Sequence, residues 1–75
     1  MIARINFKEG QSFVKFLEVK NLEKITYLSD VDGSTIEISD FQTPFLLKSR
    51  EFTFVGDSII TVSEEHINCV EFRKQ

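Results

Sequence analysis

The segment closest in pattern to a chemical site is an acidic stretch in the middle of the chain. Asp30 and Asp32 occupy the first and third positions of a sequence that begins like an EF-hand calcium loop. That loop also needs a glycine at its sixth position and a glutamate at its twelfth, where this chain has Thr35 and Phe41. Asp32-Gly33 is, however, the dipeptide most typical of a tight β-hairpin turn. We therefore expect a hairpin here and no metal site.

The chain contains a single histidine, His66, and a single cysteine, Cys69. Glu64 and Glu65 adjoin His66, but no nucleophile or orienting group accompanies them in the sequence, as acid–base catalysis would require. The neighbours of Cys69 supply no positive charge that would stabilise a thiolate. The chain also lacks a glycine-rich phosphate loop. We expect no catalytic residue, no metal ligand, no cofactor and no small-molecule substrate, and hence a protein that is not an enzyme.

The charge balance argues against broad nucleic-acid binding. Nine Lys and Arg residues are dispersed among twelve Asp and Glu residues, for a net charge of −3, whereas sequence-independent binding requires clustered basic groups. Phe13 and Phe16 flank Lys15, an arrangement that single-strand binders use on exposed sheets. Alternation along the chain predicts instead that most rings face inward. The charge and the alternation thus argue against nucleic acid as a partner, and a nucleic-acid-binding small β-barrel is the second alternative function.

Length and composition predict one small domain, residues 1–75, that gains stability from a partner. The chain has 75 residues with eight Phe, no Trp, three Gly, one Pro and one Cys, and domains of this size usually need disulfides, a metal or another subunit. One cysteine cannot form an internal disulfide. No apolar run is long enough for a signal peptide or a membrane span. We expect a cytoplasmic protein. The chain is rich in Ile, Phe, Lys, Glu and Asn, residues that codons rich in A and T encode, and this bias indicates a bacterium or phage as the source.

Alternating apolar and polar residues predict an all-β fold of about seven short strands joined by hairpins, forming a small antiparallel barrel or a compact sandwich. Residues 12–24 also fit a helix capped by Ser12, but its apolar stripe breaks at Lys20 and Asn21. A strand over 13–19 and a turn over 20–23 fit better. Residues 63–66 are expected to form one short helical or 3₁₀ turn. Predicted strands are residues 2–8, 13–19, 25–29, 36–40, 45–47, 52–55, 58–62 and 70–72.

Turn chemistry predicts the registers of three hairpins. A loop over 9–12 would pair Ile5 with Phe16 and place both on the buried face. A two-residue loop at Asp32-Gly33 would pair Tyr27 with Ile38. Gly56-Asp57 is expected to form a type II′ turn, which places glycine first.

The two ends of the chain show a similar pattern, which indicates two related halves. Leu22, Ile25 and Tyr27 align at a constant offset with three residues near the C-terminus: Ile67, Val70 and Phe72. One skipped residue also aligns Gly10 with Gly56. Hairpins in general share such features, so chance similarity is the alternative explanation.

The leading functional hypothesis is a module that binds another protein, most simply a second copy of itself, as a homo-oligomer. It rests on apolar residues that the predicted faces cannot all bury: Phe13, Leu17, Leu28, Phe45, Leu46 and Ile60. The first alternative is an acidic effector that occupies the nucleic-acid-binding surface of a target protein. Its candidate surface consists of Asp30, Asp32, Glu37, Asp40, Glu64 and Glu65.

Overall fold

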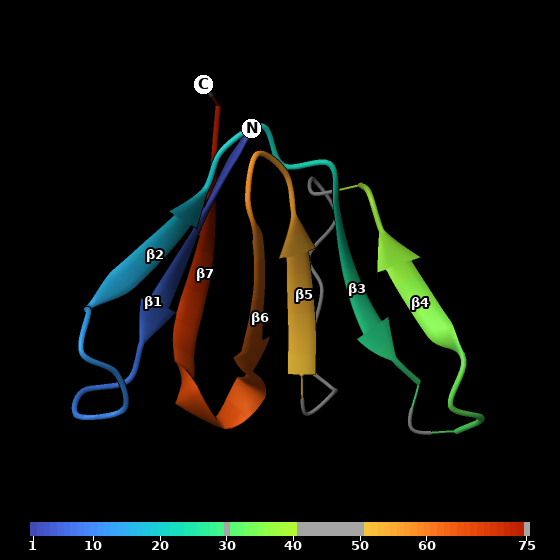
Figure 1. Ribbon diagram of the computed structural model, residues 1–75, viewed down its shortest axis with the longest axis horizontal. Coiled ribbons are helices and arrows are strands. Elements are labelled where there is room, and N and C mark those ends of the chain that lie inside the picture. Colours follow the sequence, from blue (N-terminus) through green and yellow to red (C-terminus); the bar gives the residue numbers. More distant parts are fainter. Residues whose placement is uncertain (30, 41–50, 75) are drawn as a thin grey trace.

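The computed structural model describes residues 1–29, 31–40 and 51–74, which form an all-β domain (Figure 1). Its elements are β1 (Ile2–Phe7), β2 (Phe16–Val19), β3 (Lys24–Leu28), β4 (Thr35–Ile38), β5 (Glu51–Val55), β6 (Ile59–Ser63), the 3₁₀ turn η1 (Glu64–His66) and β7 (Ile67–Arg73). The predicted fold class and the turn at 63–66 are confirmed, and the helical alternative for residues 12–24 is wrong. Across the described ranges, no helix has the length and apolar character to cross a membrane. The expected strand at 45–47 lies outside the described residues.

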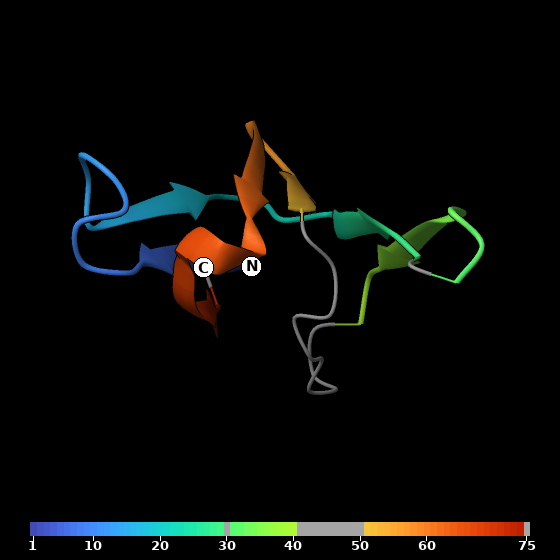
Figure 2. The ribbon, with the colours of Figure 1, turned by 90° about the horizontal axis from the view of Figure 1, so that it is seen from below.

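The strands form two antiparallel sheets. Sheet A has the order β2-β1-β7 and sheet B has the order β4-β3-β5-β6. Within the described ranges no ladder connects one sheet to the other, so the strands do not close into a hydrogen-bonded barrel. Figure 2, seen from below, shows β2 and β4 at opposite ends of the molecule.

A small core lies mainly on the buried faces of two interior strands, β1 of sheet A and β5 of sheet B. Ala3 and Ile5 on β1, and Phe52 and Phe54 on β5, have no exposed surface. Alternation explains this, because residues two apart on a strand share one face. The Tyr27 ring packs beside Phe52, with ring centroids 5.3 Å apart. Four more residues complete the buried cluster: Val19, Leu22, Ile25 and Ile67.

The strand arrangement repeats between the two halves of the chain. The β1–β2 hairpin is followed by β3, which pairs with β5; the β5–β6 hairpin is followed by β7, which pairs with β1. Each half thus gives its third strand to the first strand of the other half, so β2-β1-β7 corresponds to β6-β5-β3. Ile25 lies opposite Phe54, and Val70 lies opposite Ile5. The predicted equivalence of Ile25 and Val70 agrees with these ladders.

The hairpins of the two halves differ in length, so the predicted equivalence of Gly10 and Gly56 is wrong. Ile5 lies opposite Leu17, and the equivalent Phe54 lies opposite Ile60. The first pair is twelve positions apart in sequence and the second pair is six apart. The β1–β2 hairpin therefore contains six residues more than its counterpart, which explains why a glycine alignment could not describe both turns.

The register of the β1–β2 hairpin differs by one residue from the predicted one. Asn6, not Ile5, lies opposite Phe16. Residues 8–15 form the loop, and β2 begins only at Phe16. A shift of one position moves a side chain to the other face of the sheet. Phe16 is therefore on the outer face, and its predicted place in the core is wrong.

The β3–β4 hairpin differs from the predicted register by two residues. Tyr27 lies opposite Ile36, not Ile38, and the backbone N–H of Ser29 donates to the carbonyl of Ser34 at 2.8 Å. The connection is thus longer than the two-residue loop that Asp-Gly predicts. Because a shift of two positions preserves the face, Ile25, Tyr27, Ile36 and Ile38 still share one side, as expected.

Gly56 is required for close packing, not for a type II′ turn. It lacks the positive φ that the first position of that turn needs. A Cβ atom at residue 56 would lie 2.6 Å from the carbonyl oxygen of Lys20 and 2.9 Å from that of Asn21. The backbone N–H of Asp57 donates to the Lys20 carbonyl at 2.9 Å, and Asn21 Nδ2 donates to Asp57 Oδ2 at 2.8 Å. The β5–β6 turn therefore fastens the β2–β3 connection to sheet B.

Replacing Gly56 with alanine is expected to lower the free energy of unfolding by about 2 to 3 kcal/mol, because the backbone of residues 20 and 21 must move. Gly10→Ala is the control: Gly10 has φ +78° and open space around it, so only backbone strain of about 1 kcal/mol is added. Urea titration followed by circular dichroism measures both. An unchanged midpoint for Gly56→Ala would contradict the close-packing role.

Candidate functional site

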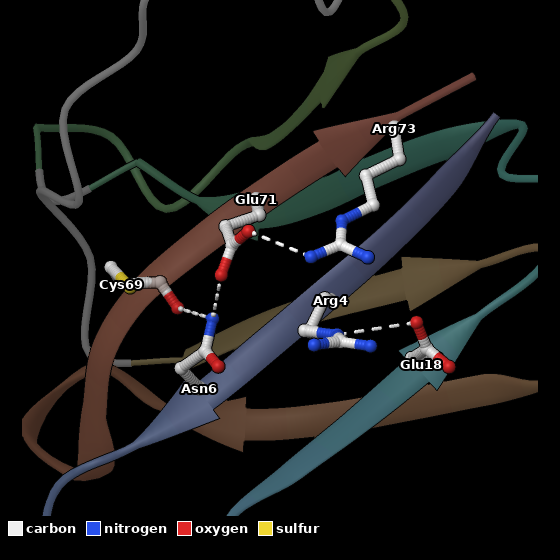
Figure 3. Close-up of polar contacts among 6 residues, drawn as sticks. All are labelled: Arg4, Asn6, Glu18, Cys69, Glu71 and Arg73. Atoms are coloured by element: carbon white, nitrogen blue, oxygen red, sulfur yellow. Dashed lines mark hydrogen bonds and ion pairs between the residues drawn. The ribbon is translucent and has the colours of Figure 1, made fainter.

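The outer face of sheet A carries a row of polar side chains that form two hydrogen-bonded groups (Figure 3). Arg4 Nε donates to Glu18 Oε2 at 3.3 Å, and Asn6 Nδ2 donates to Glu71 Oε1 at 3.1 Å. Arg73 donates to the other oxygen of Glu71 at 3.3 Å. The hydrogen bond from Arg73, followed by that from Asn6, lowers the pKa of the Glu71 carboxyl. These groups satisfy one another across the strands, so this row offers little unpaired charge to a ligand.

The β1–β2 hairpin carries four exposed apolar side chains, on its loop and on both faces of β2, which contrast with this row. We call this set the hairpin patch, and it consists of Phe13, Val14, Phe16 and Leu17. Phe13 is fully exposed in the loop, while Phe16 and Leu17 on β2 are 42% and 36% exposed. Figure 2 shows the hairpin at one end of the molecule. Four apolar side chains exposed within five consecutive residues are unusual on the surface of a monomer.

The hairpin patch is held in a defined conformation. The Phe7 N–H donates to the Lys15 carbonyl at 2.9 Å, and the Val14 N–H donates to Ser12 Oγ at 3.3 Å. On the outer face, the Arg4 guanidinium lies 4.2 Å from the centroid of the Phe16 ring. Because Arg4 also pairs with Glu18, its guanidinium is held in place, and its cation–π contact holds the Phe16 ring on this face.

The hairpin patch lies in the basic part of the chain. Residues 1–20 contain four Lys or Arg and two Glu, whereas residues 21–75 contain five basic and ten acidic residues. A hollow of about 690 Å³ opens beside the loop, and its lining includes Lys8, Phe13 and Lys15. It is a surface depression formed by the hairpin together with Asn68 of β7, so it can receive a side chain of a partner more readily than it can enclose a small molecule.

The other predicted interface residues are dispersed. Leu28 is exposed at the end of β3, but Ile60 is half-buried and packs against the core, while its neighbour Ile59 is exposed. Phe45 and Leu46 lie outside the described residues. Within the part of the chain that the structure describes, sequence reasoning missed four exposed apolar residues: Val14, Phe16, Val31 and Ile59.

One sequence signal could have revealed the exposure of Phe16. Only the observed register places Arg4 opposite Glu18, and opposite charges facing each other across strands stabilise a register. The same register pairs Ala3 with Val19, and both are fully buried. A register chosen to pair Arg4 with Glu18, and not to give a four-residue loop, places Phe16 opposite Asn6.

The acidic residues do not form one surface among the described residues. Asp32 accepts hydrogen bonds from the Ser34 backbone N–H and hydroxyl at 2.9 and 2.7 Å. Glu37 on β4 pairs with Lys24 at 3.0 Å, and Asp40 is exposed beyond β4. Glu64 and Glu65 in η1 follow β6, which lies at the other end of sheet B from β4. Asp30 lies outside the described residues.

The residues with reactive side chains remain separate. His66 Nε2 lies 3.7 Å from Glu65 Oε1, a carboxylate that is largely exposed. Cys69 is an exposed free thiol on β7, opposite Asn6. In the part of the chain that the structure describes, no three His, Cys, Asp or Glu side chains are grouped as metal ligands.

Comparison with known proteins gave no further guide. No protein family, curated protein or solved structure matches the chain.

The hydrogen bonds from Ser34 lower the pKa of the Asp32 carboxyl below its ordinary value of 3.8. A lowered pKa in the folded state stabilises the hairpin above this value, and the stabilisation is lost as the pH falls through the folded pKa. Ser34→Ala is expected to return the Asp32 pKa toward its ordinary value, as measured by carboxyl NMR titration. Ser58→Ala, in another hairpin, should leave it unchanged. An unaltered Asp32 pKa in Ser34→Ala would show that the hydrogen bond from the Ser34 hydroxyl does not control it.

Proposed function

We propose that this chain is a non-enzymatic protein-interaction domain that associates with a second copy of itself through the hairpin patch. The observation that supports this most directly is the exposure of Phe13, Phe16 and Leu17 in one ordered hairpin. Exposed apolar clusters of this kind mark interaction surfaces. A single unpaired cysteine agrees with a reducing compartment such as the cytoplasm.

The size of the core supports the same proposal. Among the described residues the buried cluster contains eight, and a domain of 75 residues buries a smaller fraction of the surface of its unfolded chain than a larger domain does. Burial of the hairpin patch against a partner adds apolar area at about 25 cal/mol per Å². Association would thus stabilise the fold as well as create an interface.

Phe13→Ser is expected to weaken self-association by about tenfold or more, because a fully exposed ring is removed from the interface. Sedimentation velocity between about 1 μM and about 1 mM measures the effect. Val31→Ser is the matched control, since Val31 is 94% exposed in a different hairpin. A wild-type chain that stays monomeric throughout this range would overturn the proposal. Equal loss in both variants would place the interface elsewhere.

The structure also provides a specific observation for single-stranded nucleic acid as a second candidate partner. Phe13 and Phe16 are exposed, not buried, and Lys15 lies between them in the basic part of the chain. Exposed rings next to Lys or Arg can stack on bases. The nearby Glu18 and the net charge of −3 weigh against it.

A mobility-shift assay with single-stranded oligonucleotides at about 50 mM salt tests this second candidate, because electrostatic affinity is greatest at low salt. Binding that disappears in Phe13→Ser and Lys15→Gln but persists in Val31→Ser would support it. Absence of a shift would eliminate it. The acidic-effector alternative has less geometric support, since its acids are split between the two ends of sheet B.

A further inference from the structure

We infer that β2 pairs in antiparallel register with β2 of a second copy, with Leu17 on the twofold axis. The product is a continuous six-stranded sheet in the order β7-β1-β2-β2′-β1′-β7′, where the prime marks the second copy. This inference rests on the proposed function and specifies how the hairpin patch would be used.

The hydrogen bonds of β2 leave one side of the strand open. The Phe7 N–H donates to the Lys15 carbonyl at 2.9 Å, in the same register that pairs Ile5 with Leu17. Bonded pairs alternate along an antiparallel ladder. The backbone groups of Leu17 and Val19 are therefore directed toward β1, and those of Phe16 and Glu18 are directed toward the free edge. Such an edge can accept another strand.

Among the sheet edges, β2 best fits this role. The edge strands β2 and β4 lie at opposite ends of the molecule (Figures 1 and 2), whereas the edge strands β6 and β7 are joined to each other through η1. The apolar side chains of β4, Ile36 and Ile38, are half-buried, and its exposed Glu37 is charged. On β2 it is the apolar side chains, Phe16 and Leu17, that are exposed.

The repeat in strand arrangement points to Leu17 independently. Leu17 on β2 and Ile60 on β6 occupy equivalent positions, because they lie opposite the equivalent residues Ile5 and Phe54. Ile60 packs against the core, whereas Leu17 is 36% exposed. The Leu17 side chain is therefore partly open to solvent at the position where the equivalent Ile60 side chain is packed against the core. A second copy of β2 would supply that cover.

Charge and side-chain direction select one register. Opposed residues must lie on the same face of the joined sheet, so the axis passes through a residue. With the axis at Leu17, Leu17 opposes Leu17 of the partner subunit and Phe16 opposes the partner's Glu18. With the axis at Glu18, two carboxylates oppose each other, which is unfavourable. With the axis at Phe16, the ladder scarcely overlaps, because β2 begins at Phe16.

The selected register also retains the contacts made within each copy. Each Arg4 keeps its own Glu18 at 3.3 Å and its own Phe16 ring. The two Phe16 rings become diagonal neighbours, within reach of each other across the new strand pair. The contact is short, and it would bury less than the roughly 800 Å² per partner of a stable complex. We therefore expect a weak, concentration-dependent dimer.

Disulfide trapping tests the register. The variant Leu17→Cys in a Cys69→Ser background is expected to form a covalent dimer in a glutathione redox buffer. Residues that oppose each other without shared hydrogen bonds have Cα atoms about 4.5 Å apart, close enough for a disulfide. Glu18→Cys in the same background is the matched control and should remain largely monomeric. Circular dichroism establishes that both variants are folded.

Each outcome separates the inference from the proposed function. Dimers from Leu17→Cys alone support the Leu17-centred register. Dimers from Glu18→Cys alone, or from both variants equally, overturn that register. Trapping in neither variant overturns the pairing centred on Leu17. The proposed function then survives if the wild-type chain sediments as a dimer, and it fails as well if the chain sediments as a monomer.

A backbone variant gives a second readout. Glu18→Pro removes the N–H that would donate to the partner, and proline is tolerated on the open side of an edge strand. Glu18→Ala removes the same carboxylate but keeps the N–H. If β2 pairs as inferred, Glu18→Pro dimerises at least tenfold more weakly than Glu18→Ala in sedimentation. Equal dimerisation of the two folded variants would overturn the inference.

Discussion

The fold depends on one tight contact between the two halves of the chain. The β2–β3 connection passes directly over Gly56, at a distance that leaves no room for a Cβ atom. The Asp57 N–H and side chain bind the same connection through Lys20 and Asn21. This contact directs β3 away from β1 and β2 and onto β5 in the other sheet. Without this contact, the β2–β3 connection would no longer be held against the β5–β6 turn, and the pairing of β3 with β5 would be weakened.

Local patterns predicted the strands well because each depends on nearest neighbours. Alternation identified the buried face of β1 at Ile5, and the 3₁₀ turn at Glu64–His66 followed from a short polar interval between strands. Registers were harder to predict, since they depend on loop length. The Asp-Gly turn gave a register off by two, which preserved the faces. The assumed loop at 9–12 gave one off by one, which wrongly placed Phe16 in the core.

The candidate site was predictable only in part. Phe13 and Leu17 were identified because the chain has more apolar residues than a thin core can enclose. Phe16 was missed because its face depends on the register of β2, and Ile60 was placed outside although it packs inward. Gly56 was recognised as a turn residue for the wrong reason. Its contact with Lys20 joins residues far apart in sequence, and no local pattern encodes such proximity.

The unequal hairpins have a consequence for how such a chain can change over time. The six extra residues between β1 and β2 carry no part of the buried cluster. Their composition is therefore free of the packing demands that govern the two central strands. Substitutions in this hairpin can change which surface the molecule binds without disturbing the buried cluster. We therefore expect the hairpin residues to vary more among related chains than the core residues do.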